Sequence, residues 1–354
     1  MKIFKGLKYL AAILLLIITN SCNDKFDITQ FQTDDDGNIT GDTVYIKLNP
    51  DWDGYNHPED VMIGREPLIY IADTDNDRIV MLNLDGQLLS SRTIKHPIAI
   101  AQDYRLNLLV CAQFDTLGQT FSAVYKLDLV ASNHDLATAP IKRILPQIAD
   151  LNKPERKYTG AAVFYDNTYL IARTGPNNSN LIDPDNSLLR FVIGNNGTTD
   201  SLIGRVPLLS PNSSGILSVN NVSSIKSFNK RNYDIVINLV GENSFKTQWF
   251  RYVSSQDFTG YENNLAPAES DLMTPGFFVK PEGSEIDASG NIYVTESSRD
   301  SVYKFNSFGD KLIGFGGPSV FSEPYAVAYF DKIVYVADRG NNRILRFILS
   351  TDVQ

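Results

Sequence analysis

The residues of this chain that can do chemistry are carboxylates and histidines placed at similar distances from prolines. His57 and His96 each stand directly before a proline. Four carboxylates lie within a few residues of Pro58, Pro281 or Pro324: Glu59, Glu282, Glu285 and Glu323. Calcium prefers carboxylate oxygens, so these side chains can hold such a cation if the fold gathers them. A histidine-based zinc site lacks a third ligand, because His134 falls in a polar segment that we expect to be an outer loop.

A repeated unit places these residues. Three copies are clear: Ile69–Asp73 with Asn76–Ile79, Val334–Asp338 with Asn341–Ile344, and Ile292–Glu296 with Arg299–Val302. A proline precedes the acid that ends each first segment by 14 or 15 residues: Pro58, Pro281 and Pro324. Pro97 marks a fourth, more divergent copy. Such repeats indicate an architecture in which similar units stack on one another.

Each unit is expected to be a four-stranded antiparallel meander. Apolar alternation in Ile292–Val294 and in the segment that follows gives strands with one buried face, and the polar cluster between them makes a tight turn. We expect Asp73 and Asp338 to cap backbone amides in that turn, with Arg78 and Arg343 closing over it.

Six units fit the chain. They begin near His57, His96, Thr159, Asn221, Lys280 and Glu323. The last unit ends one strand short at Arg346–Leu349, whereas Thr43–Leu48 is a strand that belongs to no unit. Pairing these two segments would close a ring and hide its edges.

Two stretches, Ser289–Val294 and Ala337–Ile344, resemble the NHL repeat. The resemblance implies an all-β fold, a six-bladed β-propeller over residues 43–354 whose ring is closed by strand 43–48 pairing with the last blade. The whole chain resembles the six-bladed propeller lipoproteins of Bacteroidetes.

The first residues have the features of a targeting signal. Lys2, Lys5 and Lys8 precede the apolar run Tyr9–Ile18, which is too short to span a bilayer and is typical of a signal peptide. Cys22 then follows small and polar residues, an arrangement that resembles a bacterial lipoprotein box. We therefore expect a signal peptide over 1–21, a lipid on Cys22, an acidic flexible tether over 22–42, and a lipid-anchored protein of the cell envelope, at the outer membrane. Ordinary cleavage near residue 21, leaving a free thiol, is the alternative.

Composition excludes several classes of protein. The formal charge of -9 disfavours nucleic acid as a partner. Two cysteines rule out a disulfide scaffold, and Cys111 lies in an apolar strand-like run, where we expect an inert buried thiol. Membrane contact is therefore expected through the lipid alone, and the propeller is expected to be monomeric.

The repeat register places one group of side chains at the mouth of the central channel. Its members are His57, Glu59, Asp60, His96, Asn221, Glu282, Glu285, Glu323 and Tyr325. Lactonase-type propellers hold calcium with Glu, Asn and Asp, and by this resemblance Glu59, Asn221 and Glu323 form a possible calcium trio. The alternative is that these acids are simply solvated and that the histidines are structural.

Two insertions are candidate recognition loops, because long loops on rigid scaffolds often bind partners. Thr174–Ser187 is rich in Asn and Pro. Ser254–Lys280 carries the aromatic residues Phe258, Tyr261, Phe277 and Phe278. These rings either contact a protein or glycan or pack against their own blade.

The sequence favours a non-catalytic binding scaffold for a protein or glycan partner, since no complete catalytic set is present. The alternative is a calcium-dependent hydrolase or lyase of the lactonase or propeller-lyase type with its site at the channel mouth. A purely structural envelope component is a third hypothesis. No cofactor is certain, and calcium is the one that the acids suggest.

Overall fold

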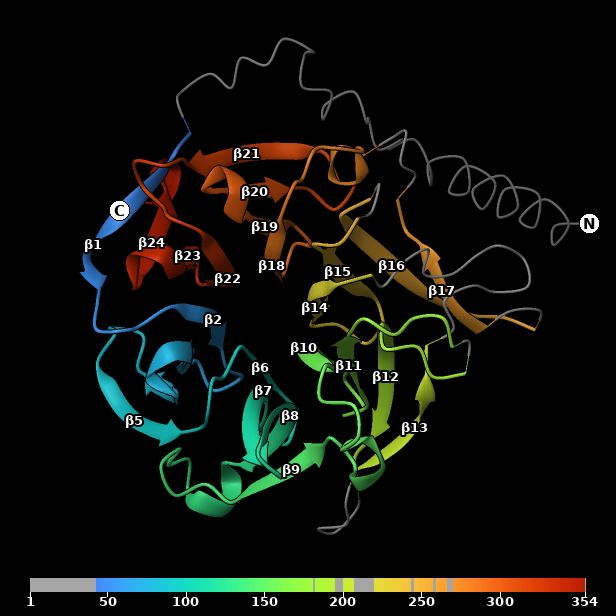
Figure 1. The fold of residues 1–354 in the computed structure, drawn as a ribbon. Helices are drawn as coiled ribbons and strands as arrows, with labels where there is room; N and C mark the ends of the chain where they lie inside the picture. The colour runs from blue at the N-terminus through green and yellow to red at the C-terminus, as the bar shows by residue number, and fades with distance from the viewer. Residues whose placement is uncertain are drawn as a thin grey trace, which may run out of the picture. The chain divides into compact units, whose positions relative to one another are not determined.

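The computed structural model describes residues 43–180, 182–194, 200–206, 220–242, 245–256, 259–265 and 270–353. Cys22, the tether and Phe258 lie outside these residues. Six four-stranded antiparallel sheets stand as blades around a central axis (Figure 1). The predicted six-bladed β-propeller is confirmed.

The blades follow the chain in order. Blade 1 comprises β2 (Pro58–Ile63), β3 (Ile69–Asp73), β4 (Arg78–Leu82) and β5 (Leu88–Thr93). Blade 2 comprises β6 (Ala99–Gln102), β7 (Asn107–Thr116), β8 (Gln119–Asp128) and β9 (Ile141–Leu145). Blade 3 comprises β10 (Lys157–Val163), β11 (Tyr169–Thr174), β12 (Ser187–Val192) and β13 (Ser201–Arg205).

The second half continues in the same way. Blade 4 comprises β14 (Val222–Ser227), β15 (Ile235–Leu239), β16 (Thr247–Ser254) and β17 (Thr259–Asn263). Blade 5 comprises β18 (Pro281–Ile286), β19 (Ile292–Glu296), β20 (Ser301–Phe305) and β21 (Lys311–Gly316). Blade 6 comprises β22 (Pro324–Phe330), β23 (Ile333–Asp338), β24 (Arg343–Leu349) and β1 (Tyr45–Trp52). Short 3-10 turns join some strands: η2 (Thr74–Asn76), η3 (Val130–Ser132), η4 (Ile148–Asp150), η5 (Asp271–Met273), η6 (Ser297–Arg299), η7 (Arg339–Asn341) and η8 (Ser350–Asp352).

The ring closes between the first and last strands. β1 pairs with β24 in antiparallel register, with Tyr45 opposite Leu349 and Leu48 opposite Arg346. This is the predicted closure, although the strand runs to Trp52 rather than ending at Leu48. Because β1 pairs with β24 and completes blade 6, the backbone groups of β24 that would otherwise form an open edge are hydrogen-bonded.

The core lies between neighbouring blades. The second strands of three blades bury a tyrosine at the same point of the repeat, three residues before its acid: Tyr70, Tyr293 and Tyr335. A single sheet cannot cover such rings on both sides, so each blade depends on its neighbours. Cys111 is also fully buried, and burial raises the pKa of its thiol, as expected for an inert cysteine.

The acid of the repeat ties a turn to the connection that precedes its blade. Asp73 accepts a hydrogen bond from the backbone N–H of Asn56 at 2.7 Å and from Nε of Arg78 at 2.6 Å. Asp338 does the same with the N–H of Ser322 and with Arg343. The expected arginine contact is therefore present. The capped amide, however, lies some 17 residues earlier in the chain and not in the turn itself.

Neighbouring blades are joined by a second repeated contact. The side chain of Asp77, at the end of a turn in blade 1, accepts a hydrogen bond from the N–H of His96 at the start of blade 2. Asp300 does the same for Glu323 between blades 5 and 6. All four residues have left-handed backbone angles, with φ between 45° and 52°. We call this contact the clasp.

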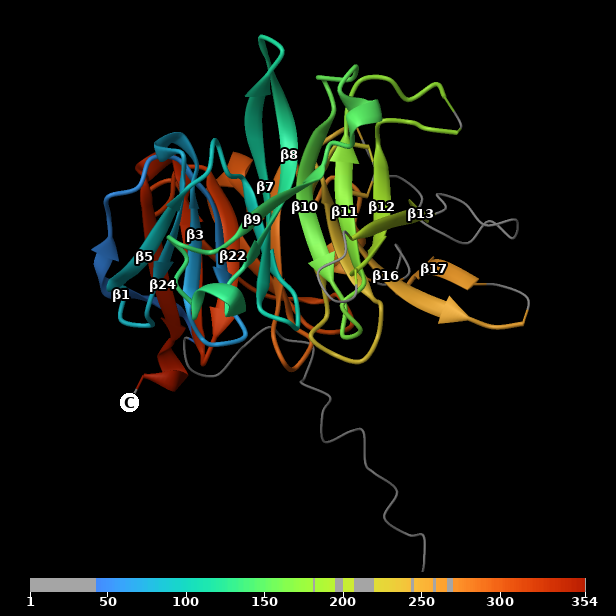
Figure 2. The same ribbon diagram turned by 90° about the horizontal axis from the view of Figure 1, so that it is seen from below.

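The two faces of the propeller differ. We call the face where the innermost strands begin the upper face and the one where they end the lower face. Figure 2 shows the β7–β8 hairpin reaching beyond the neighbouring strands at the upper face. Alternating strand directions place the start of β1 at the lower face, beside Ser350. No helix of the described residues is long and apolar enough to cross a membrane.

Candidate functional site

Six side chains, one from each blade, form a ring around the channel. They are Glu59, Ile98, Thr159, Ser223, Glu282 and Tyr325, and they line the cavities on both sides of the ring. In five blades this position coincides with a register shift of the innermost strand, such as the one between Pro58 and Asp60. A bulge re-aims a side chain, and in these five blades it accounts for the residue that faces the channel.

Arg339 occupies the space between two of the predicted carboxylates. Its Nε lies 3.1 Å from Oε1 of Glu59, and one terminal nitrogen lies 2.7 Å from Oε2 of Glu323. Burial raises the pKa of Glu59, and Arg339 opposes this rise. Glu59 and Glu323 are therefore brought together, but one arginine of the protein itself bonds to both of them.

Glu282 is held in a similar way on the next blade. It is nearly fully buried, and its Oε1 lies 3.0 Å from Nζ of Lys280. Burial raises the pKa of Glu282, which Lys280 partly offsets. Tyr325 bonds to Glu282, and burial raises the pKa of this tyrosine well above its usual value. The ring thus carries two acids that have cations of their own.

Above the ring lies a polar cavity of about 390 Å³, here called the upper cavity. The raised hairpin contributes Gln113, Thr120 and Ser122 to its wall. The connection between blades 2 and 3 contributes Arg156 and Lys157. Most lining residues carry hydroxyl, amide or charged groups, with apolar side chains such as Phe121 between them, so the cavity can receive a ligand that has both polar and apolar parts.

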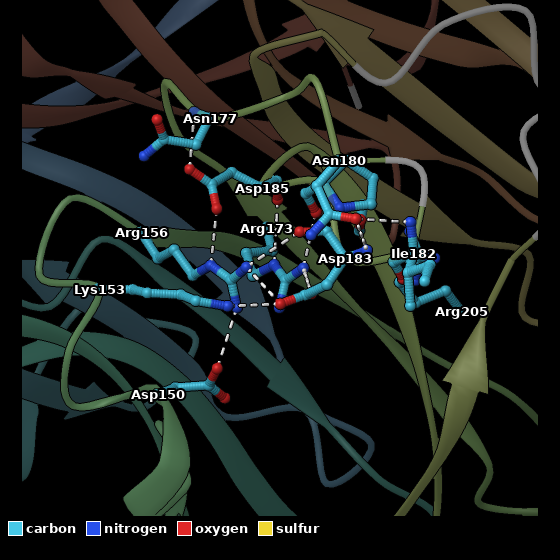
Figure 3. Close-up of polar contacts among 12 residues, drawn as sticks. Asp150, Lys153, Arg156, Arg173, Asn177, Asn180, Ile182, Asp183, Asp185 and Arg205 are labelled. Atoms are coloured by element: carbon cyan, nitrogen blue, oxygen red, sulfur yellow. Dashed lines mark hydrogen bonds and ion pairs between the residues drawn. The ribbon is translucent and has the colours of Figure 1, made fainter.

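A buried ion cluster fixes the loops beside this cavity (Figure 3). Arg156, almost fully buried, pairs with Asp150 at 2.9 Å, Asp183 at 2.7 Å and Asp185 at 2.7 Å. Arg173, also buried, pairs with Asp183 at 2.7 Å. The cluster therefore ties the connection before blade 3 to the predicted recognition loop, Thr174–Ser187. We call it the latch.

The latch is balanced in charge. Lys153 joins it through Asp183 at 2.6 Å, so three cations face three aspartates. Burial alone would raise the pKa of Asp183, but hydrogen bonds from Lys153, Arg156 and Arg173 hold it well below its usual range. The loop is consequently a preorganised surface element.

Three aliphatic side chains stand exposed on the upper face. Leu117 at the hairpin tip, Ile148 in the connection before blade 3 and Ile182 in the latched loop are 80%, 88% and 83% exposed. They are the most exposed of the large apolar side chains among the described residues. Single exposed apolar residues are common, but these three lie on adjoining loops beside one cavity. We call them the apolar tips.

Below the ring lies the larger, lower cavity, of about 520 Å³. Asp60 and Glu285, predicted at the channel mouth, lie inside it together with Lys226. Nζ of Lys226 is 2.7 Å from Oε2 of Glu285. Burial raises the pKa of Asp60 to about 6.

The remaining channel-mouth candidates lie at the upper rim. His57 and His96 both approach Asp75, His57 in a short contact and His96 at 3.6 Å. Asn221 lines the upper cavity and shares the left-handed backbone of the histidines. His134 lies in the loop between β8 and β9 of blade 2, as expected, and contacts Glu66 in the β2–β3 connection of blade 1. The three histidines do not form one cluster.

The residues present do not fit the predicted calcium trio. Glu59 and Glu323 are bonded to Arg339, so a cation at that point would have to displace the guanidinium group. Among the described residues, no group of three His, Cys, Asp or Glu side chains is arranged to hold a metal ion.

The aromatic residues of the second insertion mostly face inward. Tyr261 belongs to β17 and is buried, and Phe278 is buried between Phe305 and Tyr303. Phe277 is partly buried against the same rings. Of the two interpretations given above, contact with a partner or packing within the propeller, the second describes these three residues.

Several residues of the site were not anticipated. The ring has a sequence signal, since Glu59, Ile98, Glu282 and Tyr325 each follow a repeat proline directly. Thr159 and Ser223 have no such proline and need the strand register. Lys226, Arg339 and the apolar tips carry no motif, because their roles depend on which blades meet.

Sequence comparison gives no match to a protein-family model or to a curated protein. Solved structures match the fold. A luciferin-regenerating enzyme is 12% identical, with a TM-score of 0.57 over 86% of this chain and 95% of its own. Calcium-binding regucalcin from Agrobacterium tumefaciens is 11% identical, with a TM-score of 0.53 over 83% and 91%. An auxiliary nutrient binding protein from Bacteroides thetaiotaomicron is 10% identical, with a TM-score of 0.57 over 84% and 70%.

These similarities define the class of protein by its fold. The chain is a six-bladed β-propeller with a central channel that a ring of side chains divides. At such low identities the neighbours share an architecture that supports unrelated activities.

Proposed function

We propose that this protein is a lipid-anchored, non-catalytic binding protein of the bacterial cell envelope whose upper face binds a partner protein. It would belong to the NHL-like propeller lipoproteins of the Bacteroidetes type, at the outer membrane. The apolar tips are the observation that carries the proposal. Leu117, Ile148 and Ile182 are highly exposed on three adjoining loops.

The latch supports a protein-binding role. Exposed aliphatic groups on a mobile loop lose entropy on binding, whereas a preorganised loop loses less. Arg156 and Arg173 hold the loop that carries Ile182 through buried ion pairs. The upper face therefore presents apolar contacts at fixed positions.

The direction of the chain also supports the proposal. β1 begins at the lower face, which is opposite the face that carries the apolar tips. A few anchoring side chains supply most of the affinity of a typical protein interface, and the apolar tips can act as such anchors beside the upper cavity.

A glycan is the second candidate, and the upper cavity is the observation that favours it. Gln113, Thr120, Ser122 and Asn221 offer amide and hydroxyl groups suited to sugar hydroxyls. The calcium-dependent hydrolase or lyase gains no support from the donor geometry, because Arg339 bonds Glu59 and Glu323.

Substitution of the tips tests the proposal. Changing Leu117, Ile148 and Ile182 together to Asp should abolish co-purification of one defined envelope protein and leave the melting temperature unchanged. The matched control changes Leu88, Leu312 and Phe308, which are exposed on other parts of the disc, to Asp. Loss of a bound glycan instead, or equal loss in both triple variants, would overturn the protein-binding proposal.

A further inference from the structure

The lower cavity holds a carboxylate that has no cation of its own. Oδ2 of Asp60 accepts a hydrogen bond from the backbone N–H of Ile100 at 2.6 Å. Among the described residues, no lysine or arginine nitrogen lies within ion-pair distance of this carboxylate, and the nearby Lys226 is bonded to Glu285. Carboxylates taken out of water normally have a paired cation, so Asp60 departs from the usual arrangement.

The charges around Asp60 do not cancel. Lys226 supplies one positive charge, and Glu285 and Asp60 supply two negative ones, all on the wall of the lower cavity. Lys226 stays charged, because Glu285 raises its pKa against the effect of burial. Arg65 and Lys230 also line this cavity, but the charged side chains that act on Asp60 are Lys226 and Glu285, and with Asp60 they carry a net charge of −1 that a ligand with one positive charge would balance.

The same cavity is lined by polar atoms that lack a partner. Nε2 of Gln102, Oγ1 of Thr159 and Oγ of Ser284 make no hydrogen bond within the protein. Gln102 and Ser284 are each only 6% exposed. Buried polar groups are nearly always satisfied, and these three atoms are almost completely covered by protein, so a ligand would reach them after a small shift of the side chains around them.

We propose that the lower cavity binds a small organic cation, an alkylammonium that also carries hydrogen-bonding groups, with its ammonium on Asp60. The unpartnered amide and hydroxyl groups of Gln102, Thr159 and Ser284 contact the rest of the ligand. This site is separate from the upper face, and the proposal for it does not depend on the proposal that the upper face binds a partner protein.

The acidity of Asp60 agrees with this assignment. Burial raises its pKa to about 6, and Lys226 opposes that rise from a distance. At pH 7.5 the carboxylate is ionised and ready to accept an ammonium group. Asp60 therefore costs the empty protein stability that the bound cation restores.

Calorimetric titration of the purified full chain at pH 7.5 tests the site. The probes are putrescine and ethanolamine, with 1,4-butanediol as the uncharged match of putrescine and calcium chloride as the inorganic cation. We expect saturable one-to-one binding of at least one amine and none of the diol. Asp60→Asn should weaken amine binding about tenfold or more, because it removes a charge-assisted contact.

The control variant is Asp331→Asn, which changes the net charge equally at the exposed mouth of the same cavity and should bind as the wild type. The melting temperature shows whether Asp60→Asn is folded, since this change should raise it. Equal binding of diamine and diol, absence of amine binding, an unchanged affinity in Asp60→Asn, or calcium binding that Asp60→Asn abolishes would each overturn the proposal.

Discussion

Asn342, in the last blade, accepts a hydrogen bond from the backbone N–H of His57, in the first blade, at 2.8 Å. It is the clasp repeated across the closure of the ring, between residues 285 positions apart in the chain. β1 and β24 close the outer part of blade 6, and this contact closes the inner part. The closure therefore uses the same contact that joins blade 1 to blade 2 and blade 5 to blade 6.

Asn342→Gly should destabilise the propeller by about 1 kcal/mol, the worth of one hydrogen bond. Glycine retains the left-handed backbone of this position, where φ is 60°, so the substitution removes only the side chain. Urea unfolding measures the loss. Asn133→Gly, at another left-handed position in the outer loop of blade 2, controls for the flexibility of glycine and should be nearly neutral. Equal stabilities of the two variants would contradict the clasp.

Removing Arg156 should be far more costly than removing an exposed arginine. Arg156→Met leaves the buried Asp185 without a cation and removes one of the three cations that bond to Asp183, so it should cost about 3 kcal/mol. Arg251→Met breaks only an exposed pair with Glu262 and should cost less than about 1 kcal/mol. Denaturant unfolding compares the two variants. A difference below about 1 kcal/mol would show that the latch contributes little.

Asp60 should make the protein less stable as pH rises. Its folded-state pKa of about 6 exceeds the ordinary value of about 3.9, so between these values the folded chain holds a proton that the unfolded chain has released. The contribution of Asp60 to stability is then highest near pH 4 and is lost as pH rises through about 6. Asp60→Asn should be more stable than the wild type by about 2 to 3 kcal/mol at pH 7.5 and equal to it near pH 4. Urea unfolding of both proteins at pH 7.5 and pH 4 measures these stabilities. A stability difference between them that does not change with pH would contradict the prediction.

Calcium should leave the melting temperature unchanged after chelation and re-addition. Glu59 and Glu323 are bonded to Arg339, so an ion between them would have to displace the guanidinium group. A site filled at a hundred times its dissociation constant would add about 2.7 kcal/mol and raise the melting temperature visibly. Such a rise, with one calcium per chain, would restore the enzyme hypothesis.

The sequence predicts the fold well because the propeller repeats one local pattern. The prolines at Pro58, Pro281 and Pro324 and the acids that follow them mark the blades, and an orphan strand before Pro58 indicates the closure. The weakest blades, 3 and 4, lack these prolines, and their strands were located by apolar alternation alone. The repeated local pattern was sufficient to predict the architecture of the propeller.

The candidate site was less accessible to prediction. Glu59, Glu282 and Tyr325 were found because they follow repeat prolines, but their neutralisation was not, since Arg339 reaches Glu59 across a separation of 280 residues. The latch joins Arg156 to Asp185 between two irregular segments. Side chains that meet through the closure of the ring or through loops leave no spacing in the sequence.

Photocrosslinking in the living bacterium tests the central claim, partner binding at the upper face, most directly. A photoreactive amino acid is placed at Ile148 on the upper face or, as the matched position, at Phe308 in an exposed turn of blade 5. The account predicts one discrete crosslinked protein from position 148, lost when Leu117 and Ile182 are changed to Asp, and none from position 308. No crosslink at 148, or the same product from both positions, would contradict it.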